Sequence, residues 1–108
     1  MQKKTVVIML DYLKGPIWDS FDDFLYTGIP VIDSDAVLRK LNVQIGDMFS
    51  SYYEFNSHEQ GCWFDAERQK AEKQELLALL TQLTDRLYAL NDGSYEIDDR
   101  ATAEIRAL

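Results

Sequence analysis

The chain has 108 residues, and its 19 Asp and Glu residues outnumber its 11 Lys and Arg residues, giving a formal net charge of −8. Because 46% of the residues are hydrophobic and 12% are aromatic, the composition excludes an intrinsically disordered chain and predicts one compact domain. The acidic balance excludes nucleic acid as the expected partner, since phosphates must be met by Lys and Arg, and favours a basic partner.

The first twelve residues, MQKKTVVIMLDY, contain a short apolar run from Val6 to Leu10. This run is too short for a secretory leader or a membrane span, and the single cysteine fits a reducing compartment. We therefore expect a cytoplasmic protein with no membrane partner. Residues 5–12 begin β-branched and are apolar on both alternating faces, a pattern typical of a strand covered on both sides and central in a small sheet.

A turn is predicted at residues 14–16, Lys-Gly-Pro. The residues after it have the spacing of one face of a short helix ending before Gly28, with Trp18, Phe21, Phe24 and Leu25 on that face. We expect Trp18, Phe21 and Phe24 to lie in the core. Pro30 restricts residues 29–33 to an edge strand or an extended link.

A second helix is expected to follow, capped by Asp33 or Ser34 and with Asp35 in its favourable first turn. Its apolar residues recur at spacings of three and four, as Leu38, Leu41, Ile45, Met48 and Tyr52. Asn42 and Gly46 are poor helix formers, so we expect one kinked helix, with two helices joined near Val43 as the alternative. Residues 56–61, NSHEQG, have the composition of a loop.

Strong helix formers fill residues 65–90 without any Gly or Pro, which predicts one long helix. Its second half carries a core-facing stripe of Leu76, Leu80, Leu83, Leu87 and Leu90, whereas its polar first half is expected to project beyond the core. Gly93 ends the helix, residues 95–97 predict a short strand, and Asp98 or Asp99 is expected to cap a last helix over residues 100–108. These elements predict an α+β fold that is mainly helical, with about four helices packed on a small two- or three-stranded sheet in a single domain.

The chain offers few residues for catalysis or metal binding. His58 and Cys62 can be imagined as a metal pair or as a base and a nucleophile, but further ligands and a means of lowering the thiol pKa are missing. Cys62 is better explained as a small buried hydrophobe, and Asp98 with Asp99 as a helix cap. Phosphate-binding, serine-nucleophile and zinc-protease motifs are absent from the sequence. We therefore expect no enzyme, no metal and no cofactor.

Acidic and aromatic residues share the middle of the chain. Residues 15–67 contain ten carboxylates and two basic residues, and residues 12–64 contain eleven of the thirteen aromatic residues. Tyr and Trp are enriched at interface hot spots, and carboxylates around them complement Lys and Arg on a partner. Ordinary solvation of an acidic face is the alternative explanation.

Several short motifs follow one another in a recognisable order: LDY at 10–12, PIW at 16–18, SYYEF at 51–55, CWF at 62–64 and DGSYEIDD at 92–99. Over most of residues 5–99 this order resembles the small immunity proteins of bacterial contact-dependent growth inhibition and related polymorphic toxin systems. The resemblance implies a cytoplasmic protein that binds one cognate toxin domain and blocks it, with no catalysis of its own. Many such toxins are nucleases, which need a basic surface for the phosphate backbone.

Under this interpretation the partner-binding residues are Asp19, Asp22, Asp23, Tyr26, Tyr52, Tyr53, Glu54 and Glu59. The carboxylates would meet Lys or Arg of the toxin, and the tyrosines would supply rigid contact area. Because adjacent helical residues face different ways, at least one of Tyr52 and Tyr53 is expected in the core.

Two alternatives remain open at this point. A homo-oligomeric scaffold would self-associate through the predicted helix at residues 65–90. A ligand-binding module would have an aromatic pocket around Trp18, Trp63 and Phe64.

Overall fold

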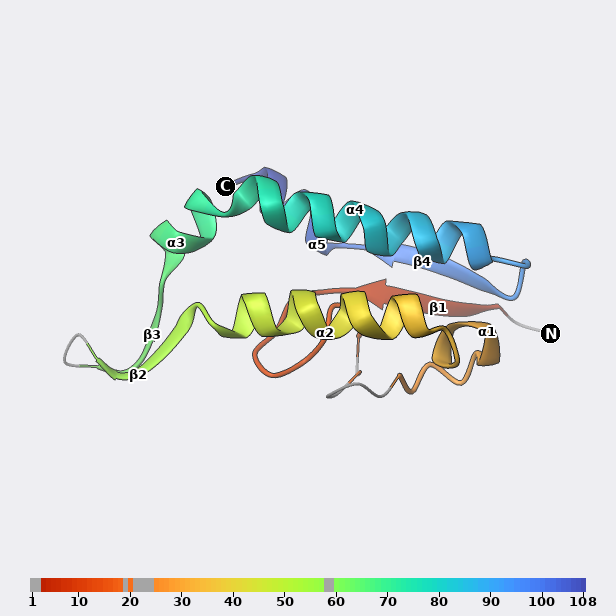
Figure 1. Ribbon diagram of the computed structural model, residues 1–108, viewed down its shortest axis with the longest axis horizontal. Helices are drawn as coiled ribbons and strands as arrows, with labels where there is room; N and C mark the ends of the chain where they lie inside the picture. Colours follow the sequence, from red (N-terminus) through yellow and green to blue (C-terminus); the bar gives the residue numbers. More distant parts are fainter. Residues whose placement is uncertain (1–2, 19, 21–24, 58–59) are drawn as a thin grey trace.

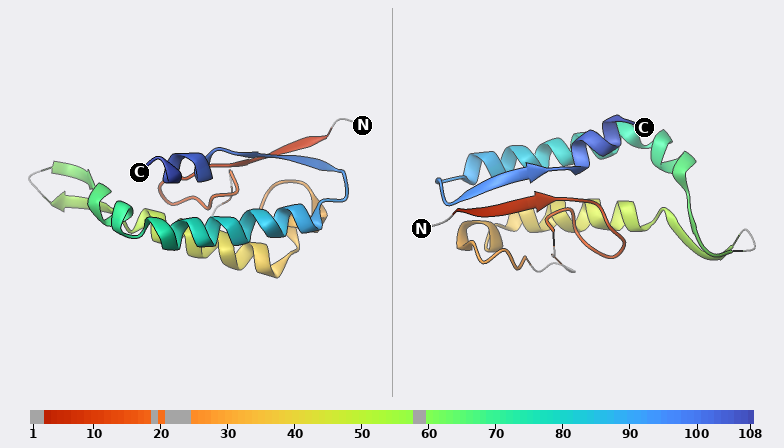
Figure 2. Two further views of the ribbon diagram at one scale, coloured as in Figure 1. Left: turned by 90° about the horizontal axis from the view of Figure 1, so that it is seen from above. Right: turned by 180° about the vertical axis from the view of Figure 1, so that it is seen from behind.

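Two strands from opposite ends of the chain pair in parallel, and two helices lie side by side over one face of the pair (Figures 1 and 2). The computed structural model describes residues 3–18, 20, 25–57 and 60–108, to which the structural statements below refer. The elements are β1 (Lys4–Ile8), α1 (Pro30–Asp33), α2 (Ala36–Ser50), β2 (Tyr53–Ser57), β3 (Gln60–Phe64), α3 (Ala66–Ala71), α4 (Lys73–Leu90), β4 (Tyr95–Asp99) and α5 (Ala101–Arg106). The predicted α+β class, mainly helical with a small sheet, is confirmed.

The parallel pair of β1 and β4 runs from Lys4 opposite Tyr95 to Ile8 opposite Asp99. On the helix side Val6, Ile8 and Tyr95 are buried, whereas Thr5 on the other face is exposed. The rear view in Figure 2 shows the strands in front of α2 and α4, with no described helix covering them. The prediction of a strand covered on both sides is therefore wrong for the described part of the chain, where Thr5 on the face away from the helices is exposed and Val7 is only partly buried.

The predicted central position of β1 is wrong, because β1 and β4 form a sheet of only two strands in the described part of the chain. The second edge of β1 is hydrogen-bonded to the chain that returns after the turn, with the Met9 nitrogen donating to the Pro16 oxygen and the Trp18 nitrogen donating to the Val7 oxygen, both at 2.9 Å. The strand thus has hydrogen-bonded chain on both edges, with β4 on one side and residues 16–18 on the other.

The core lies between α2, α4 and the parallel strands. The leucine stripe of α4 is confirmed, since Leu76, Leu80, Leu83 and Leu87 are fully buried, and Leu90 is partly buried against the same core. On α2 the facing residues are Leu38, Leu41 and Ile45.

The predicted single helix over residues 65–90 is wrong, because the chain forms α3 and α4 with a break at Glu72. At the break, the carboxylate of Glu72 accepts hydrogen bonds from the Tyr52 hydroxyl at 2.9 Å and from Arg68 Nε at 3.2 Å. A tertiary contact thus outweighs the helix propensity of the sequence. The side chain of Asp65 caps α3 by accepting from the Arg68 nitrogen.

Residues 29–33 are not an edge strand or an extended link. They form the short helix α1, with Pro30 in its first turn, where the missing N–H of proline costs no hydrogen bond. Asp33 does not cap α2, because its carboxylate accepts hydrogen bonds from Thr27 and Gly28 and so fastens the preceding loop. The cap of α2 is Asp35, which accepts from the Leu38 nitrogen at 2.9 Å.

The helix α2 is continuous from Ala36 to Ser50 and includes Asn42 and Gly46. These two residues face the chain that returns from β1. Asn42 Oδ1 accepts from the Ile17 nitrogen at 2.9 Å, and a Cβ on Gly46 would lie 3.0 Å from the Lys14 carbonyl oxygen. Both residues therefore serve tertiary packing, which explains why they stand in a helix that they do not favour.

The predicted loop at residues 56–61 is wrong, because β2 and β3 form an antiparallel hairpin. Tyr53 pairs with Phe64 and Phe55 with Cys62, so large side chains gather on one face of the hairpin. The hairpin projects from one end of the long axis of a molecule that measures 51 × 23 × 23 Å (Figure 1).

The first predicted helix falls largely on residues outside the described part of the chain, Phe21 and Phe24 among them, and the described residues beside it are not helical. Trp18, expected in the core, is only partly buried. At the other end β4 and α5 confirm the predicted strand and helix, and Asp99 Oδ1 accepts from the Thr102 nitrogen at 3.0 Å. In the described part of the chain, every helix is too short or too polar to cross a membrane.

Candidate protein-binding surface

Six aromatic rings meet where the hairpin joins the body of the molecule. The rings of Tyr12 and Tyr53 lie 4.9 Å apart, those of Tyr53 and Phe64 4.9 Å apart, and those of Tyr12 and Phe55 5.4 Å apart. Tilted and edge-to-face pairs of this kind contribute about 0.5–1.5 kcal/mol each beyond their buried area. We call this set the hairpin cluster; its members are Tyr12, Phe49, Tyr52, Tyr53, Phe55 and Phe64.

Tyr52 is the inner anchor of the hairpin cluster. It follows the end of α2 and is fully buried, its hydroxyl donates to Glu72, and the Arg68 guanidinium lies 5.3 Å from the ring centroid. Burial first, and the Glu72 hydrogen bond second, raise the pKa of Tyr52 far above its ordinary value. The expectation that at least one of the two tyrosines lies in the core is confirmed for Tyr52.

The solvent side of the hairpin cluster is apolar. Phe55 is 51% exposed in the middle of β2, and Leu13, in the turn next to Tyr12, is 57% exposed. The Leu13 nitrogen donates to Ser50 Oγ at 2.9 Å, which fixes this turn to the last turn of α2. We call Tyr12, Leu13 and Phe55 the apolar patch.

Two exposed carboxylates lie near the hairpin cluster, Asp11 and Glu104. Burial raises the pKa of Tyr53, and Asp11, Cys62 and Glu104 raise it further. The nearby cations have other contacts: Lys14 Nζ lies 4.6 Å above the Trp18 ring, and Arg68 is paired with Glu72.

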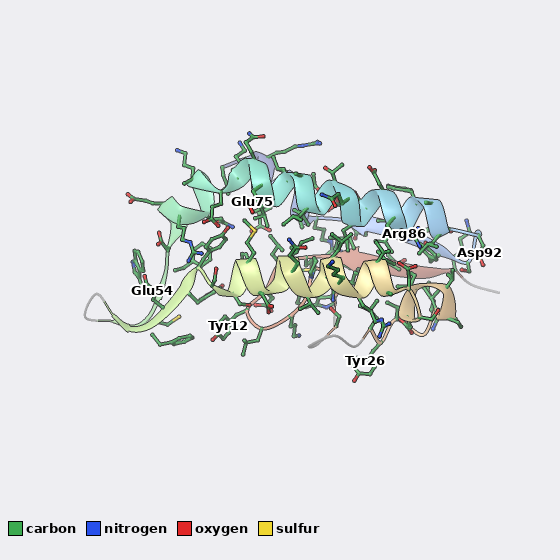
Figure 3. The ribbon with its side chains drawn as sticks, in the orientation of Figure 1. Tyr12, Tyr26, Glu54, Glu75, Arg86 and Asp92 are labelled. Carbon is green, nitrogen blue, oxygen red and sulfur yellow. The ribbon has the colours of Figure 1, made fainter. Side chains whose placement is uncertain are left out.

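The structure separates the predicted partner-binding residues. Tyr53 and Glu54 lie on the hairpin, and Tyr52 lies beneath it. Tyr26, 67% exposed, lies near the opposite end of the molecule beside α1, well away from Glu54 (Figure 3). Four of the eight predicted residues lie outside the described part of the chain: Asp19, Asp22, Asp23 and Glu59.

Sequence reasoning did not place Tyr12, Leu13 and Phe55 in this surface. The alternation of Tyr53, Glu54 and Phe55 is a strand signal that the polar residues after it obscured. Tyr12 reaches the hairpin through long-range packing, for which a single sequence carries no signal.

His58, considered above together with Cys62, lies outside the described part of the chain. No group of three or more His, Cys, Asp or Glu residues in the described part of the chain is placed to hold a metal ion. Cys62, predicted to be buried, is exposed because it lies on the projecting hairpin opposite Phe55. Trp18 lines a hollow beside β1 that neither Trp63 nor Phe64 lines, so these three rings do not enclose the predicted pocket.

Comparisons of the chain with protein-family models, with curated proteins and with solved structures found no match. The hairpin end combines two properties that bear on function. One is the exposed apolar patch, and the other is the pair of exposed carboxylates near it, Asp11 and Glu104.

Proposed function

We propose that this protein is an immunity protein that binds and neutralises a cognate, basic toxin domain through the hairpin end. The observation that carries the proposal is the exposed apolar patch, in which the turn after β1 meets the projecting hairpin through Tyr12 and Phe55, on a chain with a net charge of −8. The order of sequence motifs, which resembles that of immunity proteins, supports the same proposal independently.

The apolar patch has the physical properties of an interface centre. Burying one large apolar side chain contributes roughly 1.5–3 kcal/mol, and Phe55 and Leu13 leave more than half of that surface in water in the free protein. The hairpin cluster fixes Tyr12 and Phe55 against each other at 5.4 Å, so binding orders few side chains and costs little conformational entropy.

The charge of the chain selects a basic partner. A net charge of −8 and the exposed carboxylates of Asp11 and Glu104 near the hairpin steer a positively charged domain towards the hairpin end and accelerate association. A nuclease is the toxin class that fits best, because its phosphate-binding surface must be basic. An acidic protein bound to that surface would exclude the nucleic acid.

The predicted residues take different parts in this proposal. Tyr53 and Glu54 contact the partner from the hairpin, and Tyr52 acts indirectly by holding the hairpin in place. Asp19, Asp22, Asp23 and Glu59 remain predicted contacts with Lys or Arg. The leucine stripe of α4 is buried within this chain, so self-association, the alternative, would need another face of α3 or α4.

Two experiments test the proposal: capture of the partner from a lysate, and protection of cells against the captured domain. The tagged protein is incubated with lysate of its source organism, bound chains are identified by mass spectrometry at low and high salt, and the captured domain is expressed in cells with or without this protein. We expect a basic domain that is retained less at high salt and that arrests growth only when this protein is absent.

A pair of matched variants links the result to the hairpin. Phe55→Ser removes a half-exposed ring from the apolar patch, and Tyr88→Ser removes an exposed ring from the last turns of α4, away from the hairpin. Phe55→Ser should abolish protection while Tyr88→Ser keeps it, with both variants folded by circular dichroism. An acidic captured domain, or equal protection by the two variants, would overturn the proposal.

A further inference from the structure

Leu13 has a backbone conformation that does not suit its side chain. Its φ of 60° makes it the one non-glycine residue with positive φ in the described part of the chain. In this left-handed region Cβ crowds the following carbonyl oxygen, so glycine and asparagine are the residues usually found there. A leucine at this position therefore strains the free protein.

The surrounding structure holds Leu13 in this conformation. Its nitrogen donates to Ser50 Oγ at 2.9 Å, and the turn is closed by the Lys14 nitrogen, which donates to the Asp11 oxygen at 3.4 Å. The Asp11 carboxylate is turned back to accept from the Tyr12 nitrogen at 2.7 Å. The turn is thus fixed at both of its ends.

Packing does not compensate for the strain. The Leu13 side chain is 57% exposed, so the free protein gains little from an apolar group at this point. Strained residues that a fold maintains in this way cluster at binding and catalytic sites. The turn presents an apolar side chain outward beside Tyr12, at the edge of the apolar patch.

We propose that Leu13 is a specificity-determining anchor of the hairpin-end surface and inserts into an apolar hollow flanked by Lys or Arg on the partner. This inference rests on the proposed function and adds the shape and charge of the partner's surface. The basic flanks follow from two exposed carboxylates, Asp11 beside Tyr12 and Glu104 near Tyr53. These carboxylates, with a net charge of −8, oppose docking of a second copy of this chain.

The first test separates a role in binding from a role in folding. Leu13→Gly relieves the left-handed strain, so the melting temperature of the free protein should rise by about 2–5 °C. Leu13→Asn, which also tolerates this conformation, should not lower it. A fall in melting temperature for both variants would show that Leu13 packs for stability and would overturn the inference.

The second test uses a phage-displayed library of random twelve-residue peptides, selected on the immobilised full-length protein. Enriched peptides should combine large apolar residues with Lys or Arg, and their affinity should fall about tenfold or more for Leu13→Gly. Val37→Ser removes another exposed apolar side chain, from the first turn of α2, and should leave affinity within about twofold. Failure to enrich peptides, peptides without basic residues, or unchanged affinity for Leu13→Gly would each overturn the inference.

These outcomes are separate from those of the proposed function. If a toxin domain is captured and neutralised equally by Leu13→Gly and by the unmodified protein, the function stands and the role of Leu13 fails. If basic peptides bind through Leu13 but no toxin domain is neutralised, the surface assignment stands and the immunity function fails.

Discussion

The side chain of Asn42 in α2 holds the backbone of Ile17, with Asn42 Oδ1 accepting from the Ile17 nitrogen at 2.9 Å. Its amide nitrogen donates to Ser20 Oγ at 2.7 Å, and all three residues are buried. The segment held in this way also supplies the second edge of β1 through Trp18. One polar residue in a helix therefore connects the helix layer to the sheet.

Replacing Asn42 by alanine should lower the free energy of unfolding by about 3 kcal/mol, because the buried Ile17 N–H and the Ser20 hydroxyl lose their partner. Gln44→Ala, at an exposed position of the same helix, should change stability by about 0.5 kcal/mol or less. Urea denaturation of the two variants measures the difference. Similar values for both would show that the Asn42 hydrogen bonds contribute little.

The backbone of Gly15 lies against this amide. A Cβ at Gly15 would overlap the side chain of Asn42, whereas a Cβ at Gly61 would meet no atom within 4 Å. Because Asn42 is held by two hydrogen bonds and cannot move aside, Gly15→Ala should destabilise the protein by about 2 kcal/mol. Gly61→Ala is the matched control and should be neutral or slightly stabilising, as measured by thermal unfolding. A neutral Gly15→Ala would mean that the contact is looser than described.

The sequence predicted elements that depend on local pattern and missed those that depend on distant partners. The leucine stripe of α4 and the Asp99 cap follow from helical periodicity and cap chemistry. The break at Glu72 depends on a hydrogen bond from Tyr52, twenty positions away, and Pro30 fits a helix start as well as an extended link. The hairpin was missed because the polar composition of residues 56–61 is that of a loop as well as of a strand turn.

The candidate surface was only partly predictable for the same reason. Tyr53 and Glu54 were identified from residue type, but Tyr26 was assigned to the same surface although the fold places it elsewhere (Figure 3). The positive φ of Leu13 arises from the turn and from Ser50, and leucine gives no indication of it in a sequence.

Tyr52→Phe should lower the free energy of unfolding by about 1 kcal/mol near neutral pH, through loss of the hydrogen bond to Glu72. Burial and Glu72 raise the pKa of Tyr52 in the folded protein, so the unfolded chain releases this proton first. The stabilisation is therefore fully present below about pH 10 and is lost as the pH rises above that value.

The corresponding measurement is chemical denaturation between neutral and strongly alkaline pH. The unmodified protein should lose stability more steeply with rising pH than Tyr52→Phe does. Tyr88→Phe, at an exposed position of α4, serves as the control and should follow the unmodified protein. Identical alkaline slopes for all three proteins would rule out a buried, neutral Tyr52.

The ion pair between Asp35 and Arg86 joins the start of α2 to α4, with Arg86 Nη2 2.7 Å from Asp35 Oδ1 and Arg86 Nε 3.2 Å from Asp35 Oδ2. The hydrogen bond from Arg86 holds the pKa of Asp35 below its ordinary value of 3.8. The unfolded chain therefore takes up this proton first as the pH falls. The resulting stabilisation is fully present above about pH 4 and is lost at lower pH as the folded carboxyl becomes protonated.

Asp35→Asn tests this charge without removing the helix cap, because asparagine caps helices as well as aspartate does. Near neutral pH the variant should be less stable by about 1 kcal/mol, a value kept small by the partial exposure of Arg86. Urea denaturation at a series of pH values should show that the difference in stability between Asp35→Asn and the unmodified protein shrinks as the pH falls below about 4. Asp85→Asn, at an exposed position next to Arg86 in the chain, should show no such dependence. A constant deficit for Asp35→Asn across the series would mean that the loss comes from the cap rather than from the ion pair.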